Sequence, residues 1–76
     1  MNKDRRKQLS EIGEQLEAIK EQLEALCDEE QDYYDNMPEG IQSGERGEKA
    51  QSAIENMEAA IDALDEALPA IEEAQA

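Results

Sequence analysis

The chain has 76 residues, of which 21 are Asp or Glu, 7 are Lys or Arg and none is His, so its formal net charge is −14. A chain this short forms one small domain at most and buries only about 60% of its unfolded surface. Because it has no Phe or Trp, we expect it to need a second copy or a partner for stability. No apolar run approaches the roughly 20 residues of a membrane span, and the basic start lacks the apolar stretch of a signal peptide. A single cysteine fits a reducing compartment, so we expect a cytoplasmic protein without membrane contact.

Charge is distributed unevenly along the chain. Residues 1–7 carry four bases and one acid, so residues 8–76 carry −17. Such a surface repels nucleic acid and attracts basic surfaces, so we expect no direct nucleic-acid binding and a protein partner with a basic surface. The basic cluster Lys3–Lys7 has two interpretations, a phosphate or membrane patch and an internal complement to Glu72 and Glu73. We favour the internal complement, since a patch usually needs more bases.

The first predicted helix extends from about Lys3 to Asp32. Its apolar residues follow one another at steps of three and four, which places them on one stripe of a helix. They are Leu9, Ile12, Leu16, Ile19, Leu23 and Leu26.

A turn is predicted over about residues 33–43, where Asn36, Pro38 and Gly40 disfavour a continuous helix. We expect Pro38 to open a short helical turn and Ser43 to cap the second helix. Two interpretations of the turn compete: its apolar side chains plug the end of the bundle, or its exposed side chains form a recognition tip. We favour the first. The plug would consist of Met37, Ile41, Tyr33 and Tyr34, the tip would present Tyr34, Arg46 and exposed acids, and Gly47 serves the turn.

The second predicted helix extends from about Gly44 to Glu73 and repeats the same steps. Its stripe comprises Ile54, Met57, Ile61, Leu64, Leu68 and Ile71. In an antiparallel hairpin the numbers of facing residues have a constant sum, and pairing Leu9 with Ile71 through Leu26 with Ile54 gives 80 in every layer. This register places Tyr33 opposite Gly47. We therefore predict an all-α fold, a single coiled-coil-like helical hairpin over residues 1–76.

The two flanks of this stripe differ in chemistry. One flank is neutral, and the recurrence of alanine every seven residues favours close approach of another helix, although alanine is also simply the best helix former. We expect two hairpins to dimerise there into a four-helix bundle. This Ala/Gln face comprises Gln15, Gln22, Ala53, Ala60 and Ala67. We predict that the opposite flank, the acidic face, binds a partner, and the alternative is an acidic face that is only solvated. It comprises Glu14, Glu17, Glu21, Glu24, Glu58, Asp62 and Asp65. Lys20 is its only base, placed within reach of Glu58.

Catalytic and cofactor-binding patterns are not found. Without His no Ser-His or Cys-His pair forms, and carboxylates on solvated helices lack a cleft that would shift their pKa, so we expect no enzyme. Cys27 lies among acidic residues that disfavour a thiolate, which predicts a packed, unreactive thiol. The stretch from Asp28 to Glu39 has faint calcium-loop character, but Tyr33 occupies the position that requires Gly. We therefore expect neither metal nor cofactor.

The segment Tyr33–Glu48, with the sequence YYDNMPEGIQSGERGE, carries a resemblance. Together with the acidic Ala/Ile/Leu helix after it, this block resembles short uncharacterised proteins encoded in phages, prophages and other mobile elements of bacteria. The resemblance covers roughly half the chain. It implies a bacterial host cell as the setting and supplies no mechanism.

Three classes of function remain open. The first is an acidic binding protein that occupies the nucleic-acid site of a host protein, as a DNA mimic or anti-defence inhibitor of the anti-CRISPR kind. The second is an assembly module that oligomerises or docks in a larger phage complex through the Ala/Gln face. The third is an antitoxin-like adaptor that binds one partner through the leucine stripe. We favour the first, because −17 over residues 8–76 exceeds the magnitude of about 2 to 8 that solubility requires.

Overall fold

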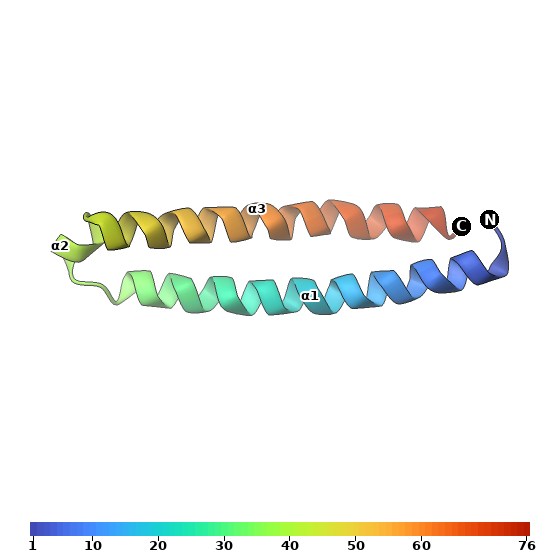
Figure 1. Cartoon of the computed structure of the whole chain (residues 1–76), viewed down its shortest axis with the longest axis horizontal. Helices are drawn as coiled ribbons and strands as arrows, with labels where there is room; N and C mark the ends of the chain where they lie inside the picture. Colours follow the sequence, from blue (N-terminus) through green and yellow to red (C-terminus); the bar gives the residue numbers. More distant parts are fainter.

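The computed structural model describes residues 1–76 and contains three helices, α1 (Lys3–Asp35), α2 (Glu39–Gln42) and α3 (Glu45–Ala74). α1 and α3 lie antiparallel, side by side, and α2 forms the turn between them (Figure 1). The molecule is a rod of 58 × 14 × 12 Å, with both termini at the end opposite α2. The predicted all-α hairpin is confirmed, and each long helix begins and ends within three residues of its predicted limits. Below, the end at α2 is the turn end, and the end at the termini is the open end.

Side chains cap most of the helix ends. The Asn2 side chain accepts a hydrogen bond from the backbone N–H of Arg5 at 2.8 Å and so caps the N-terminus of α1. Pro38 precedes α2, as predicted for a residue that opens a helical turn. The expectation for Ser43 was wrong, because Gly44 is the N-cap of α3. Ser43 is instead the C-cap of α2, and its hydroxyl donates to the Glu39 carbonyl at 3.1 Å.

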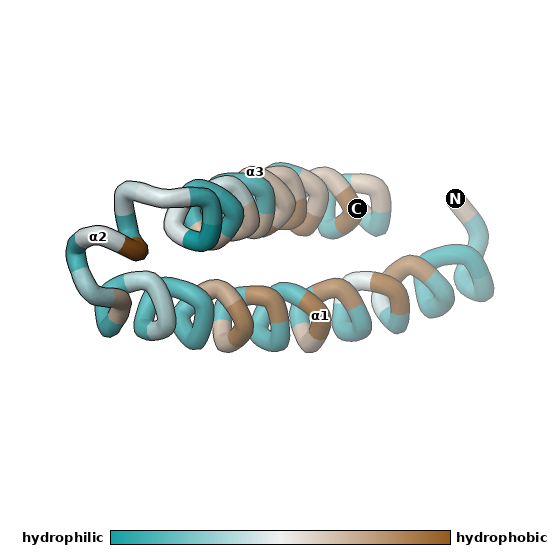
Figure 2. Tube along the Cα trace, turned by 60° about the vertical axis from the view of Figure 1, so that its left-hand side comes forward, coloured by the Kyte–Doolittle hydropathy of each residue, from teal (hydrophilic) through white to brown (hydrophobic).

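α3 faces α1 with its predicted apolar stripe, whereas α1 is rotated away from its own. Leu9, Leu16 and Leu23 are half-buried, but Ile12, Ile19 and Leu26 are exposed. α1 also turns inward a second row of shorter or amphipathic residues, the first three of which lie four residues after Leu9, Leu16 and Leu23. These residues are Gly13, Lys20, Cys27 and Tyr34. Figure 2 shows the apolar residues recurring along α1. The predicted α1 stripe is therefore only half correct.

The register of the two helices also differs from the prediction. A Cβ atom on Gly13 would lie 3.8 Å from Cγ2 of Ile71, so this isoleucine packs one helical turn further along α1 than Leu9, its predicted partner. The inward positions, counted from Leu9 to Met37 along α1 and from Gln75 back to Gly47 along α3, then pair layer by layer.

The hairpin has a very small core. Only Cys27, Gly47, Ala50 and Ile54 are buried, and all four lie in the half of the rod nearer the turn. Because the hairpin is a single layer of two helices, every inward side chain has water on at least one side. No helix combines the length and the apolar character that crossing a membrane requires.

Candidate binding faces of the hairpin

The acidic face is formed jointly by α1 and α3. The ion pair between Lys20 and Asp65 and the hydrogen bond from Gln51 Nε2 to the Tyr34 hydroxyl (3.0 Å) join the helices on this side of the hairpin. All seven carboxylates predicted for this face are exposed. Glu14 and Glu17 lie beside Glu72 around one shallow depression, so acids from both helices meet there.

Lys20 is the only base on this face, and it already forms an ion pair within the molecule. Its Nζ lies 2.5 Å from Oδ1 of Asp65. The hydrogen bond to Asp65 raises the pKa of Lys20 above its ordinary value of 10.5, and the charges of Glu24 and Glu17 raise it further. The expectation that Lys20 would reach Glu58 was wrong, because the shifted register brings Asp65 to it. Asp65 is therefore neutralised within the molecule, and the other six carboxylates have no basic partner on this face.

Cys27 is buried between the helices, as predicted for a packed thiol. Its Sγ lies 4.0 Å from the backbone oxygen of Ile54, to which it donates a weak hydrogen bond. Burial raises the pKa of the Cys27 thiol above its ordinary value of 9.0, and the charges of Glu58 and Asp28 raise it further. The thiolate, which is the reactive form, is therefore disfavoured.

The opposite side of the hairpin carries more apolar surface than the sequence predicted. On the Ala/Gln face, Gln15, Gln22 and Ala60 are exposed while Ala53 and Ala67 are half-buried. Beside them lies a row of large exposed residues spaced seven apart on α1, which we call the apolar band. The exposed fractions of its members are Ile12 44%, Ile19 45%, Leu26 55% and Tyr33 49%. Three of the four belong to the predicted α1 stripe, so only the rotation of α1 distinguishes them from core residues.

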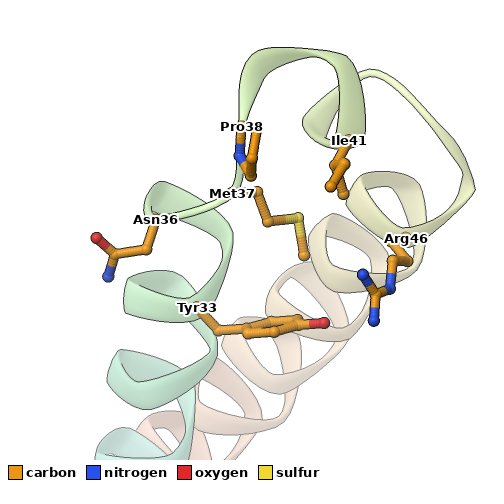
Figure 3. Close-up of a pocket in the computed structure, with 6 residues that line it drawn as sticks. All are labelled: Tyr33, Asn36, Met37, Pro38, Ile41 and Arg46. Carbon is orange, nitrogen blue, oxygen red and sulfur yellow. The ribbon is translucent and has the colours of Figure 1, made fainter.

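The turn end links the apolar band to α3. Tyr33 and Arg46 line the same shallow depression of about 370 Å³, in which Met37 and Ile41 also point inward (Figure 3). Arg46 begins the seven-residue series that continues through Ala53, Ala60 and Ala67. Because residues seven apart stay on one side of a helix, the alanine row and the apolar band share one face.

Gln42 organises the turn, a role that sequence analysis missed. Its side chain donates to the Tyr34 carbonyl at 2.8 Å, which satisfies one of the free carbonyls at the C-terminus of α1. Its backbone lies directly on Gly47, where any Cβ atom would overlap it. The expectation that Tyr33 covers Gly47 was therefore wrong, since Gly47 accommodates Gln42 and Tyr33 is exposed. The spacing of glutamine and glycine alone gives no signal for this contact.

Asn36 and Tyr34 also have structural roles at the turn. Asn36 follows α1, lines the same depression (Figure 3) and donates its side-chain amide to the Asp32 carbonyl at 2.8 Å. Tyr34 is half-buried between the helices, whereas its neighbour Tyr33 is not. Structural roles therefore account for much of the turn, and Tyr33 and Arg46 are left on its surface.

No group of three or more Cys, Asp or Glu side chains in the chain is arranged to hold a metal ion. The depressions described here are shallow and open, with volumes no larger than about 370 Å³. The molecule therefore presents faces, one acidic and one apolar, and these are its candidate functional surfaces. The chain matches no protein-family model, no curated protein and no solved structure.

Proposed function

We propose that this protein is a small helical binding protein whose acidic face occupies the basic, nucleic-acid-binding surface of a bacterial host protein. The observation that carries the proposal is the unbalanced charge of this face. Its single base, Lys20, is engaged by Asp65, so the remaining carboxylates are available to an external cation. Arg and Lys of a nucleic-acid site are such cations.

The spacing of the carboxylates supports the same function. On a helix, side chains three or four residues apart lie about 5 to 6 Å apart, and those seven apart lie about 10 Å apart along the axis. These distances bracket the spacing of phosphates along a DNA strand. Glu14, Glu17, Glu21 and Glu24 follow this spacing on α1, and Glu58 and Asp62 follow it on α3. The rod therefore supplies two parallel rows of negative charge.

The proposal is tested by capture and competition. The immobilised chain is exposed to a bacterial lysate at about 0.05 M and about 0.5 M NaCl, because charge-mediated binding weakens as salt screens it. A captured protein is then purified and bound to a labelled DNA or RNA duplex. We expect the chain to displace the duplex.

A triple variant, Glu17→Gln, Glu21→Gln and Glu24→Gln, tests the face itself. It removes three charges from the acidic face and should weaken displacement roughly tenfold or more. The matched control changes Glu11, Glu66 and Glu73 to Gln, which removes three exposed charges from the outer sides of the helices. Equal effects of the two triple variants, or no displacement of the duplex at all, would refute the proposal.

The second candidate function is a self-associating assembly module, and the apolar band favours it. A monomer in water would expose four large apolar side chains along one face, which is the signature of an interaction surface. We propose that two hairpins cover these side chains in a four-helix bundle. Since the apolar band and the acidic face lie on opposite sides, self-association leaves the acidic face free.

A further inference from the structure

We infer that a second copy of this chain covers the apolar band, with the turn ends of the two hairpins at opposite ends of the bundle. This inference rests on the self-association proposed above and is independent of the function proposed for the acidic face. It assigns the interface to Ile12, Ile19, Leu26 and Tyr33, with the alanine row of α3 beside them. It also fixes the orientation of the two molecules.

The exposed area of the hairpin matches the needs of a dimer. The chain exposes 5663 Å². A compact monomer of its 8.5 kDa mass exposes on the order of 4,700 Å², so the excess is roughly 1,000 Å². A stable interface buries about 800 Å² on each partner. Covering one long face would therefore bring the exposed area per chain to that of an ordinary folded protein.

The composition of the face specifies a helical partner of the same kind. Around the apolar band the face carries uncharged side chains, Gln8, Gln15 and Gln22 on α1 and the alanines on α3. The exposed Met1 and Ile41 extend the apolar surface toward the two ends of the rod. Arg5, Glu29 and Arg46 are the only charged side chains in these rows. On a chain of charge −14, this nearly neutral face is therefore the place where a second, equally acidic copy can approach without strong repulsion.

Charge at the two ends of the rod selects the orientation. Residues 28–49, at the turn end, carry eight acidic and two basic side chains. Residues 3–7 and 70–76, at the open end, together carry four basic and three acidic side chains. Two hairpins with turns at the same end would place both strongly acidic ends side by side. With turns at opposite ends, the basic cluster of each hairpin lies beside the acidic turn end of the other.

The same orientation also lets the side chains of the two copies pack against each other. α1 then runs antiparallel to the partner's α1, about an axis between Gln22 and Leu23. Ile19 meets the partner's Leu26, and Ile12 meets the partner's Tyr33, so each layer pairs large apolar side chains. The alanine rows of the two α3 helices meet on the other side of the bundle, where small side chains permit close approach.

The orientation is measured with a spin label at the tip of the turn. Gly40 accepts a side chain, because a Cβ atom there has no neighbour within 4 Å. The Gly40→Cys variant is labelled in a Cys27→Ser background, and the distance between the two labels of a dimer is measured by pulsed electron resonance. Turns at opposite ends predict about 50 Å, from 1.5 Å per helical residue on either side of the axis. A distance near 20 to 30 Å would overturn the orientation.

The interface is tested separately by mass. Light scattering should give twice the 8.5 kDa mass of the chain at tens of micromolar. The double variant Ile19→Gln and Leu26→Gln should have the mass of the monomer, because it removes two apolar side chains from the interface. The hairpin itself should tolerate the change, since both residues are exposed in the single hairpin and glutamine is uncharged. Ala18→Gln with Ala25→Gln, on the outer side of the same helix, should leave the dimer intact.

The outcomes separate the two proposals. A wild-type monomer would overturn both the self-association and the inferred interface. A dimer that survives Ile19→Gln with Leu26→Gln, or one that shows the short label distance, would overturn the inference alone and leave self-association standing. The label measurement uses the unaltered interface, so it remains decisive even where the double glutamine variant loses helicity. None of these results depends on a host partner.

Discussion

Lys20 and Asp65 form the only ion pair that joins the two long helices, with 2.5 Å between Nζ and Oδ1. The pair lies beside the leucine layers, so the aliphatic stem of Lys20 packs inward while its charge stays at the edge. It joins α1 and α3 near the middle of the rod.

The first prediction concerns alkaline pH. The pKa of Lys20 is raised in the folded chain, so its contribution to stability is complete below 10.5 and is lost as pH rises through the folded value. Asp65→Asn should remove this contribution at neutral pH. The difference between wild type and Asp65→Asn in the urea midpoint should therefore shrink at alkaline pH. Asp62→Asn removes the same charge from an unpaired position, and a pH profile like that of Asp65→Asn would contradict the prediction.

The second prediction contrasts two glycines. At Gly13 a Cβ atom would make an ordinary contact with Ile71, so Gly13→Ala should stabilise the helix by about 0.5 to 1 kcal/mol. At Gly47 a Cβ atom would overlap the backbone of Gln42, so Gly47→Ala should destabilise the protein by about 1 to 3 kcal/mol. Urea unfolding followed by circular dichroism measures the stability of both variants. A stabilising Gly47→Ala would show that the turn lacks this contact, and a destabilising Gly13→Ala would contradict the ordinary contact with Ile71.

The sequence predicts the helices and the turn well because their signals are local. Heptad steps mark the apolar side of each helix, and Pro38 and Gly40 interrupt the pattern between them. The rotation of α1 is not a local property, since it depends on how the two apolar rows of α3 pack over the one inward row of leucines on α1. A heptad pattern marks Leu9 and Ile12 alike, although the first lies inside the hairpin and the second outside.

The acidic face could be predicted for a related reason. Charged residues lie outside the stripe in any register, so a small rotation leaves Glu17 and Glu24 on the same side. Individual pairs are more sensitive, because a shift of one turn exchanges Glu58 for Asp65 beside Lys20. Ser43 shows a further limit: its hydroxyl suits either the end of α2 or the start of α3, and sequence does not say which is nearer.

The third prediction concerns the reactivity of Cys27. Burial and the neighbouring acids raise its pKa, so fewer thiolates form at any pH below that value. With a disulfide reagent that releases a coloured thiol, at about pH 8, Cys27 of the folded protein should react much more slowly than Cys27 of the chain unfolded in urea. The exposed cysteine of Gly40→Cys in the Cys27→Ser background serves as the control and should react at nearly the same rate in both conditions. A fast native reaction of Cys27 would mean that the helices separate readily at this point.

The fourth prediction isolates the turn. Gln42→Ala removes the amide that donates to the Tyr34 carbonyl, which should cost about 1 kcal/mol and fray the last turn of α1. Gln51→Ala, the control, removes an exposed hydrogen bond to the Tyr34 hydroxyl and should cost less. Amide hydrogen exchange at the C-terminal turn of α1 distinguishes local fraying from global loss. If Gln51→Ala has the larger effect, the hydroxyl of Tyr34 holds the turn instead.

The last prediction concerns salt, and it follows from the same charges that define the acidic face. The six carboxylates of this face without an ion-pair partner repel one another along two facing helices, which opposes folding at low ionic strength. Raising NaCl from about 0.02 M to about 0.3 M shortens the screening distance to less than the width of the face, so the melting temperature should rise. The triple variant Glu17→Gln, Glu21→Gln and Glu24→Gln should melt higher than wild type at low salt, and the gap should narrow as salt is added. If the gap is independent of salt, glutamine stabilises the helix by some means other than relief of repulsion.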